Sequence, residues 1–351
     1  MYKKFFMGIA AMAALTLVSC SSDDLNSVSD NSSKNEAISF DGYLGRSAVA
    51  VNGSRGSVLN KDALQKLGEG FGVFGNYSSE GTTAAYGKNW FDNQKVTFTS
   101  GAWIYEPLKY WLPQGHIDFL AYAPYDAKNT AITDFKSKID FTVDKEIAKQ
   151  KDLLWANAEQ QTKTDKPVTF NFKHALAKIG YTVKTNVVGT GTTITLNKIT
   201  LAGSADGKKN AFYTVGTIDL SKTSSEGLWT QSSSDTKQNF DWFSGTQPTT
   251  TITSASTPNP GTDYLFVIPQ DFSKTEPNAD ELYVIVEYTI NYNTGELKTM
   301  TNKVYQKLEK NFLQGKAYTI NLNIGLTPIE FNAEVNDWDP KDGESIDASW
   351  N

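Results

Sequence analysis

The sequence predicts an all-β protein built from two β-sandwiches in tandem. Short segments with apolar residues at every second position recur from residue 38 to residue 335, and no series of helical segments alternates with them. Clusters of Gly, Asn, Asp, Pro and Ser separate these segments, as turns require. The chain beyond the first 36 residues is long enough for two cores, since 39% of all residues are hydrophobic and 12% are aromatic.

The first 20 residues have the pattern of a bacterial lipoprotein export signal. Lys3 and Lys4 precede an apolar run from Phe5 to Val18, and Ser19 then precedes Cys20, the only cysteine. We predict that residues 1–19 form a removed signal peptide and that lipid on Cys20 tethers the mature chain to the outer membrane. A chance apolar helix or a membrane anchor is the alternative, but the run is too short to span comfortably.

A polar segment follows the lipidated cysteine. Residues 20–36 are rich in Ser, Asp, Asn and Lys, so they offer too little apolar surface to offset the cost of ordering the chain. We predict a flexible leash over this range. Its acidic start, Ser21-Ser22-Asp23-Asp24, resembles the surface-export signal of lipoproteins in Bacteroidetes, which implies a location on the cell surface.

The alternation of apolar and polar residues predicts where the strands lie along the chain. Two short helices are expected at 61–67 and 145–151, and Asn293-Thr294-Gly295 is expected to turn a hairpin. We place the domain boundary near Phe172, which gives an N-terminal sandwich over 37–172 and a C-terminal sandwich over 173–351. Strands are predicted at 38–44, 95–99, 117–123, 138–143, 168–172, 179–184, 193–201, 212–220, 264–269, 282–290, 298–306, 317–324 and 329–335.

Charge and cysteine usage exclude several kinds of partner. The formal net charge is -6 and no basic stripe is present, so we predict no nucleic-acid partner. Once Cys20 carries lipid, no thiol remains for a disulfide or a thiolate metal site. We therefore predict no metal and no cofactor.

No catalytic constellation emerges from the residues. The two histidines, His116 and His174, lack a metal-ligand spacing, and the apolar neighbours of His174 favour a structural role. The glycine-rich stretch at 68–72 lacks the Lys-Ser/Thr ending of a phosphate loop. The aspartates at 337–342 do not form a calcium loop, because Lys341 occupies a ligand position. We predict that the protein is not an enzyme.

An ordered set of motifs resembles the fimbrillins, the pilin family of type V pili in Bacteroidia. No single motif is specific, but together they span almost the whole mature chain in the expected order. They are the lipobox at Cys20, Ile38-Ser39-Phe40 with Arg46, Phe71-Gly72-Val73-Phe74-Gly75, Tyr110-Trp111-Leu112-Pro113 with Ile117-Asp118-Phe119-Leu120-Ala121-Tyr122-Ala123-Pro124, Asp152-Leu153-Leu154-Trp155-Ala156, Phe170-Asn171-Phe172-Lys173-His174-Ala175-Leu176-Ala177-Lys178-Ile179, Gly315-Lys316-Ala317-Tyr318-Thr319-Ile320-Asn321-Leu322 and Val335-Asn336-Asp337-Trp338.

The resemblance implies two transthyretin-like sandwiches and assembly with other fimbrial subunits. In family members that polymerise, an arginine-specific protease removes the first strand, and a C-terminal strand of the next subunit fills the vacated groove. An extended segment can do so because its backbone pairs with the exposed N–H and C=O groups, while its apolar side chains cover the apolar floor of the groove. Head-to-tail contacts that do not close then give a filament.

Two arginines lie where such processing would occur. Arg46 and Arg55 are the only arginines in the chain, and the stretch between them has the composition of a loop. Cleavage after Arg46 would remove the lipid together with the strand that carries Ile38, Phe40 and Leu44. The alternative is that a lysine-rich composition left two arginines there by chance.

A C-terminal segment has the pattern of a donor strand. Ile329, Phe331, Ala333 and Val335 alternate with polar residues, so one face could fill a groove. A second, shorter alternation follows at Ile346, Ala348 and Trp350. Both segments could instead simply complete the second sandwich.

Three functions are compatible with the sequence. The first is a subunit of a fimbrium, in its shaft or at its tip, that serves adhesion to a host or bacterial surface ligand. The second is a fimbrial anchor or unprocessed surface lipoprotein. The third is a surface glycan-binding lipoprotein that uses Trp90, Trp103, Trp229 and Trp242 as a platform. Core packing is the commoner role of aromatic residues in a β-sandwich.

Overall fold

The computed structural model describes residues 37–44, 61–79, 89–129, 137–185, 191–224, 228–232, 236–249, 264–294, 296–324 and 330–337. These described residues belong to one compact unit. The prediction of an all-β protein is confirmed, because the regular elements of these ranges are strands apart from the helix α1 (Lys61–Lys66) and the 3-10 turn η1 (Ile147–Lys149). The helix expected at 145–151 is thus only this short turn.

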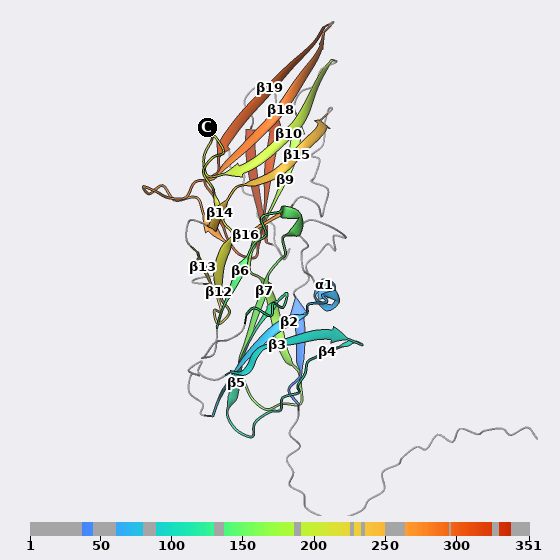
Figure 1. The fold of residues 1–351 in the computed structure, drawn as a ribbon, viewed down its shortest axis with the longest axis vertical. Coiled ribbons are helices and arrows are strands. Elements are labelled where there is room, and N and C mark those ends of the chain that lie inside the picture. The colour runs from blue at the N-terminus through green and yellow to red at the C-terminus, as the bar shows by residue number, and fades with distance from the viewer. Residues whose placement is uncertain are drawn as a thin grey trace, which may run out of the picture. The chain divides into compact units, whose positions relative to one another are not determined.

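A seven-stranded sheet holds the N-terminal strands (Figure 1). Its pairs are antiparallel except for the first and second strands in the sheet order, which run parallel. The order across the sheet is β1 (Phe40–Leu44), β8 (Val168–His174), β7 (Leu154–Gln161), β5 (His116–Ala123), β2 (Phe71–Ser78), β3 (Asn89–Thr99) and β4 (Ala102–Ile104).

The two ends of this sheet approach each other around an aromatic core. A Cβ built on Gly42 of β1 would lie 3.5 Å from the Trp103 ring of β4, the strand at the opposite end. Side chains from β1, β2, β3, β5 and β8 fill the interior, together with Leu64 of α1. The alternation that predicted β8 is exact, since its exposed and buried residues alternate along its full length.

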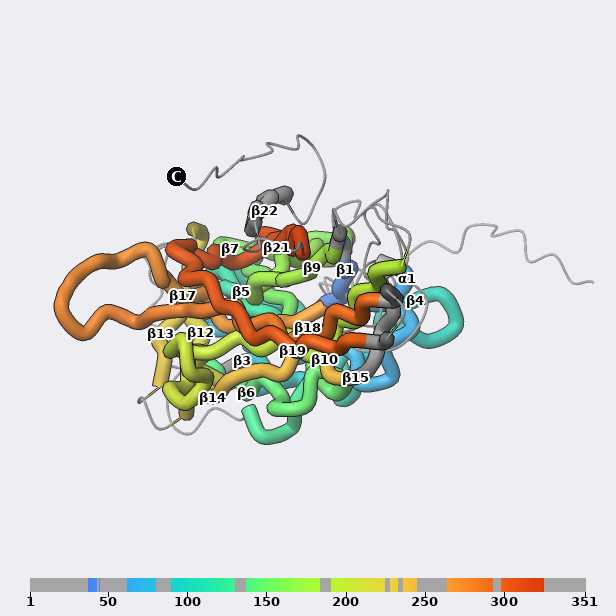
Figure 2. Tube along the Cα trace, turned by 90° about the horizontal axis from the view of Figure 1, so that it is seen from above, coloured from blue at the N-terminus to red at the C-terminus, as the bar shows by residue number. Residues whose placement is uncertain are grey.

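Two four-stranded sheets form the core of the C-terminal strands. In Figure 1, β15 (Phe240–Thr249), β10 (Thr192–Ala202), β18 (Tyr283–Thr294) and β19 (Glu296–Lys307) run side by side in the order of the first sheet. The second sheet has the order β16 (Leu265–Val267), β9 (Ala177–Thr185), β21 (Lys316–Ile324) and β22 (Glu330–Asp337), and Figure 2 shows β21 beside β9. The sheets pack together, because the Tyr181 ring of β9 meets the Trp242 ring of β15 at 4.6 Å. The hairpin expected at residues 293–295 joins β18 to β19.

Short strands complete the described chain. β6 (Lys138–Thr142) pairs with β12 (Val215–Asp219), which also pairs with β13 (Trp229–Gln231). Two small ladders join β11 (Phe212–Tyr213) to β14 (Lys237–Gln238) and β17 (Gln270–Asp271) to β20 (Asn311–Phe312). A segment before residue 172 therefore hydrogen-bonds to strands after it, and the domain boundary near Phe172 stays a prediction.

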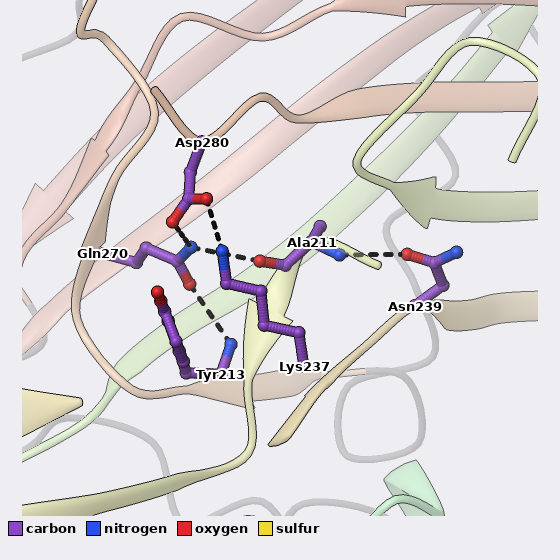
Figure 3. A network of polar contacts seen from close by, with 6 residues as sticks. All are labelled: Ala211, Tyr213, Lys237, Asn239, Gln270 and Asp280. Atoms are coloured by element: carbon purple, nitrogen blue, oxygen red, sulfur yellow. Dashed lines mark hydrogen bonds and ion pairs between the residues drawn. The ribbon is translucent and has the colours of Figure 1, made fainter. Parts of the chain in front are cut away.

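A polar network holds these short ladders together (Figure 3). Lys237 forms an ion pair with Asp280, and the Gln270 side-chain amide donates to the other Asp280 oxygen at 2.8 Å and to the Ala211 carbonyl oxygen at 3.0 Å. The Tyr213 backbone N–H donates to Gln270 Oε1 at 3.3 Å. A buried polar group without a partner costs stability, and the polar groups of this network bond to one another. We therefore assign the network a structural role, which is to hold the short strands in place.

Candidate functional site

The predicted first strand is held between two other segments of the chain. On one side β1 pairs in parallel with β8, in the register Phe40 to Val168 through Leu44 to Phe172. On the other side the Ile38 N–H donates to the Lys109 carbonyl oxygen at 2.8 Å, and Ala37 forms a bridge with Tyr110. The first strand is thus paired with β8 along Phe40–Leu44, and on its other side it is held only at its start, by the contacts of Ala37 and Ile38.

The side chains of this strand fill an aromatic pocket. Ile38, Phe40 and Leu44 are 1%, 4% and 4% exposed, as alternation predicts for one buried face. The Phe40 ring lies 5.4 to 5.6 Å, centroid to centroid, from four rings, which belong to Phe91, Tyr105, Phe119 and Phe170. Burying side chains of this kind stabilises the fold by roughly 1.5 to 3 kcal/mol each.

Gly42 occupies a narrow place beside this pocket. A Cβ at Gly42 would meet the side chains of Phe172, Leu64 and Trp103 at 3.4 to 3.5 Å, which is ordinary van der Waals contact. A methyl group therefore fits there, whereas a branched or aromatic side chain would need its neighbours to move. We call the slot with its Phe40 pocket and its Gly42 notch the first-strand groove.

A buried hydroxyl fixes the entrance of the groove. The Tyr105 hydroxyl donates to the Ile38 carbonyl oxygen at 2.7 Å and accepts from the Lys109 N–H at 3.3 Å. Burial raises the pKa of Tyr105 above its ordinary value, so the hydroxyl stays protonated and able to donate. The same hydroxyl also lies 3.3 Å from the Lys109 carbonyl oxygen, so it links the first strand to the segment beside it.

β8 depends on the first strand for much of its pairing. Residues Val168 to Phe172 pair with β1, and of β8 only Lys173 and His174 pair with β7. Removing β1 would therefore leave alternate residues of this part of β8, beginning with Val168, with unpaired N–H and C=O groups on the groove side. Such an edge binds an extended segment readily.

The predicted modification sites lie outside the described residues. β1 ends at Leu44 and the next described residue is Lys61, so Arg46 and Arg55 both lie between two described ranges. The same holds for Cys20 in the leader. Cleavage at either arginine and lipidation stay predictions.

The predicted donor strand is placed at the end of its own sheet. β22 pairs antiparallel with β21, with Phe331 opposite Leu322, Ala333 opposite Ile320 and Val335 opposite Tyr318. β22 is last in the order of that sheet and has no further strand beside it among the described residues. Ile329 and the second alternation at 346–350 lie outside the described ranges.

Both histidines have structural partners in buried positions. His174 Nδ1 lies 2.7 Å from Asp152 Oδ2, and burial lowers the pKa of the nearby Lys178 to about 8 although Asp152 opposes that shift. His116 Nε2 lies 3.0 Å from the Gln160 side-chain nitrogen. Within the described ranges no group of three or more His, Cys, Asp or Glu could hold a metal ion. A search of the same ranges finds no helix long and apolar enough to cross a membrane.

The four tryptophans of the glycan hypothesis pack into the protein. Trp103 and Trp242 are buried, and Trp90 and Trp229 are half-buried against the two cores. The Trp229 indole donates to the Ala175 carbonyl oxygen at 2.7 Å. They come from separate elements and do not make an exposed platform, which favours the packing role.

Sequence reasoning missed the wall of the first-strand groove. Tyr105, Leu64 and Trp103 come from segments that no alternation pattern singled out. One sequence signal was available, because Gly42 interrupts the large residues of the first strand at an inward position. A glycine at such a place indicates a close approach by another part of the protein.

Comparisons with known proteins agree with this architecture. A sequence profile of the family described as fimbrillin-like matches residues 60–338. A protein of Phocaeicola vulgatus named fimbrium subunit Fim1C is 27% identical over 93% of this chain and 94% of its own length. The crystal structure of a fimbrial protein from Bacteroides vulgatus superposes with a TM-score of 0.67 at 22% identity, covering 86% of this chain and 99% of that one, and so shares the fold. Because the profile covers most of the sequence, this chain belongs to the fimbrillin-like family.

Proposed function

We propose that this protein is a structural subunit of a cell-surface fimbrium that serves adhesion. It is exported as a lipoprotein on Cys20, cleaved at Arg46 or Arg55 by an arginine-specific protease, and assembled by strand exchange with other fimbrial subunits. The similarity to a protein named fimbrium subunit Fim1C supports the subunit role. Membership of the fimbrillin-like family supports the location at the cell surface.

One observation carries the assembly mechanism. The first strand is the N-terminal element of the described chain, it fills the first-strand groove, and the only two arginines of the sequence follow its last residue, Leu44. A single cut after either arginine therefore separates the strand and the lipid from the rest of the chain. The vacated slot has the apolar floor and the unpaired edge that an incoming strand needs.

The proposal is tested at the arginines. Cells that express Arg46→Lys/Arg55→Lys keep the positive charges but lose the protease sites, so the chain should stay full length from Cys20 and no fibres should form. Wild-type surface material should begin at Ser47 or Gly56 by N-terminal sequencing. The single variants are matched controls that identify the arginine used. Fibres that persist with an uncut chain would contradict the proposal.

The two alternatives predict other outcomes of the same experiment. An anchor or unprocessed lipoprotein stays intact and monomeric on wild-type cells, and Cys20→Ser releases it. A glycan-binding protein binds a glycan array whether or not it is cleaved, and it loses that binding in Trp229→Ala. The contact between Trp229 and Ala175 predicts instead that this substitution lowers stability without affecting glycans.

A further inference from the structure

Two ladders of parallel strands lie between the first and the last elements of the described chain. β1 pairs in parallel with β8 over residues 40–44 and 168–172. β9 pairs in parallel with β21 over residues 178–185 and 317–324. Only residues 175–176 separate the end of β8 from the start of β9. The two ladders are therefore linked by an almost continuous length of strand.

These ladders form a short route for tension through the molecule. Tension that enters at the start of β1 can pass across the first ladder to β8, along the chain to β9, and across the second ladder to β21. The segments 45–167 and 186–315 lie outside this route. They carry little load for as long as both ladders hold.

The first ladder is loaded along its strands. Tension reaches β1 at its N-terminal end and leaves β8 at its C-terminal end, and in a parallel pair these are opposite ends of the ladder. The hydrogen bonds then share the tension and must break together, whereas the bonds of a ladder that is pulled apart from one end break one at a time. Sliding of β1 would also draw Phe40 out of its pocket of four rings, which adds to the resistance.

The C-terminal strand is loaded in the other way. β22 pairs antiparallel with β21 and with no other strand among the described residues. Lys178 of β9, Ala317 of β21 and Asn336 of β22 lie side by side at one end of this sheet. A pull between the start of β9 and the end of β22 therefore opens the β21–β22 ladder from that end. Once β22 has left, the pull acts on Ile324, at the opposite end from Lys178, and the β9–β21 ladder is loaded along its strands.

We propose that the uncleaved chain is a load-bearing tether that yields in a fixed order. β22 peels from β21 at low force, and the β1–β8 and β9–β21 ladders then hold the load. Such an order gives a surface fibre a small extension at low load and keeps both cores intact at higher load. This inference goes beyond the proposed function, because it requires neither cleavage nor a strand from another copy.

Pulling the chain by its two ends tests the order of yielding. The mature chain with Cys20→Ser is held by handles fused to its ends in a single-molecule force experiment. We expect a first short step, which releases the length of residues 325–337, and then two steps at a force about twofold higher or more. These later steps should release residues 45–167 and 186–315, at roughly 3.6 Å per residue. Release of either long segment before the short step, or at the same force, would overturn the proposal.

Moving the handles tests how the first ladder is loaded. Ser39→Cys/Lys173→Cys attaches the handles at opposite ends of the β1–β8 ladder, so the pull acts along the strands. The matched control Asp41→Cys/Thr169→Cys attaches them to two residues that face each other across the same ladder. All four positions are exposed, and Cys20→Ser leaves no other cysteine. The first pair should rupture at about twice the force of the control or more. Equal rupture forces would refute the assigned geometry.

The second ladder allows the same comparison. Lys173→Cys/Asn323→Cys pulls β9 and β21 from opposite ends, whereas Lys184→Cys/Asn323→Cys pulls at two residues that face each other. The first pair should again rupture at about twice the force of the second or more, and equal forces would overturn the role of this ladder. Melting temperatures of the variants check that the cysteines leave the fold intact. Because all these measurements use uncleaved chain without a partner, their failure would leave the proposed function standing.

Discussion

Phe40 holds the first strand in its pocket through contacts with four aromatic rings. Its ring is surrounded by Phe91, Tyr105, Phe119 and Phe170, in arrangements that range from stacked to edge-on. Aromatic pairs of this kind add about 0.5 to 1.5 kcal/mol beyond the burial of their area. A side chain with so many ring contacts holds the strand in place, and in the proposed assembly these four rings would line the pocket that the strand leaves.

We therefore expect Phe40→Ala to lower the free energy of unfolding of the uncleaved chain by about 3 to 5 kcal/mol, because it leaves a cavity among rings. Denaturant titration measures the change. Asp41→Ala, on the exposed face of the same strand, is the matched control and should change stability by no more than about 0.5 kcal/mol. Equal unfolding midpoints for the two variants would contradict the role assigned to Phe40.

The sequence predicts the role of His174 but not the residue that it contacts. Sequence reasoning assigned His174 a structural role from its apolar neighbours, and the structure pairs its ring with Asp152 at 2.7 Å in a buried position. The identity of that partner could not be predicted from sequence. Asp152 precedes β7 and His174 ends β8, and only the antiparallel pairing of these strands brings the two together.

Among the elements, β8 links the state of the first strand to the rest of its sheet. Its first five residues pair with β1, and the Val168 N–H donates to the Ser39 carbonyl oxygen at 2.8 Å. Its last two residues pair with β7. The front part of β8 therefore exchanges one partner for another during the proposed assembly, while its end stays in the sheet.

Hydrogen exchange should report this change of partner. After cleavage and removal of the first strand, the amide of Val168 should exchange faster, on the order of a hundredfold, because its acceptor has gone. The slow rate should return once the chains have assembled. β5 amides lie inside the same sheet and serve as the control, with protection expected in all three states. Unchanged exchange at Val168 after cleavage would mean that the strand has not left.

The positions of strands were largely predictable from sequence. Alternation places β8, β10 and β21 because a strand with one buried face repeats every two residues, and this repeat is visible locally. The same pattern does not say which strand lies beside which. The parallel pairing of β1 with β8 and the pairing of β6 with β12 join segments far apart in the chain.

In the proposed assembly, each molecule donates its C-terminal strand to one neighbour and accepts a strand from another in its first-strand groove. These two functions belong to different parts of the molecule. The donor strand is the last element of the described chain, and the acceptor groove is opened at its first. A copy can therefore lose either function while it keeps the other. An association with two different ends does not close on itself and grows into a filament.

Mixing two inactive variants tests this separation. Arg46→Lys/Arg55→Lys cannot open its groove but keeps its donor strand, and Phe331→Asp can be cleaved but carries a charge on the apolar face of its donor strand. We expect each variant alone to stay monomeric after protease treatment and the mixture to form dimers, as light scattering measures. Longer ladders from the mixture, or dimers from either variant alone, would show that the two functions are not divided in this way.

By itself, the sequence determined the β class and the positions of most strands, and it predicts an export signal at Cys20 and two segments with matching alternation. These features depend on residues that are neighbours in the chain, where periodicity, charge and turn chemistry act directly. Only the tertiary structure decided that the first strand runs parallel to β8, that Phe40 is surrounded by aromatic side chains from separate segments, and that a Cβ at Gly42 would be in van der Waals contact with Phe172, Leu64 and Trp103. The walls of the groove come together through long-range strand pairing, which local patterns do not encode.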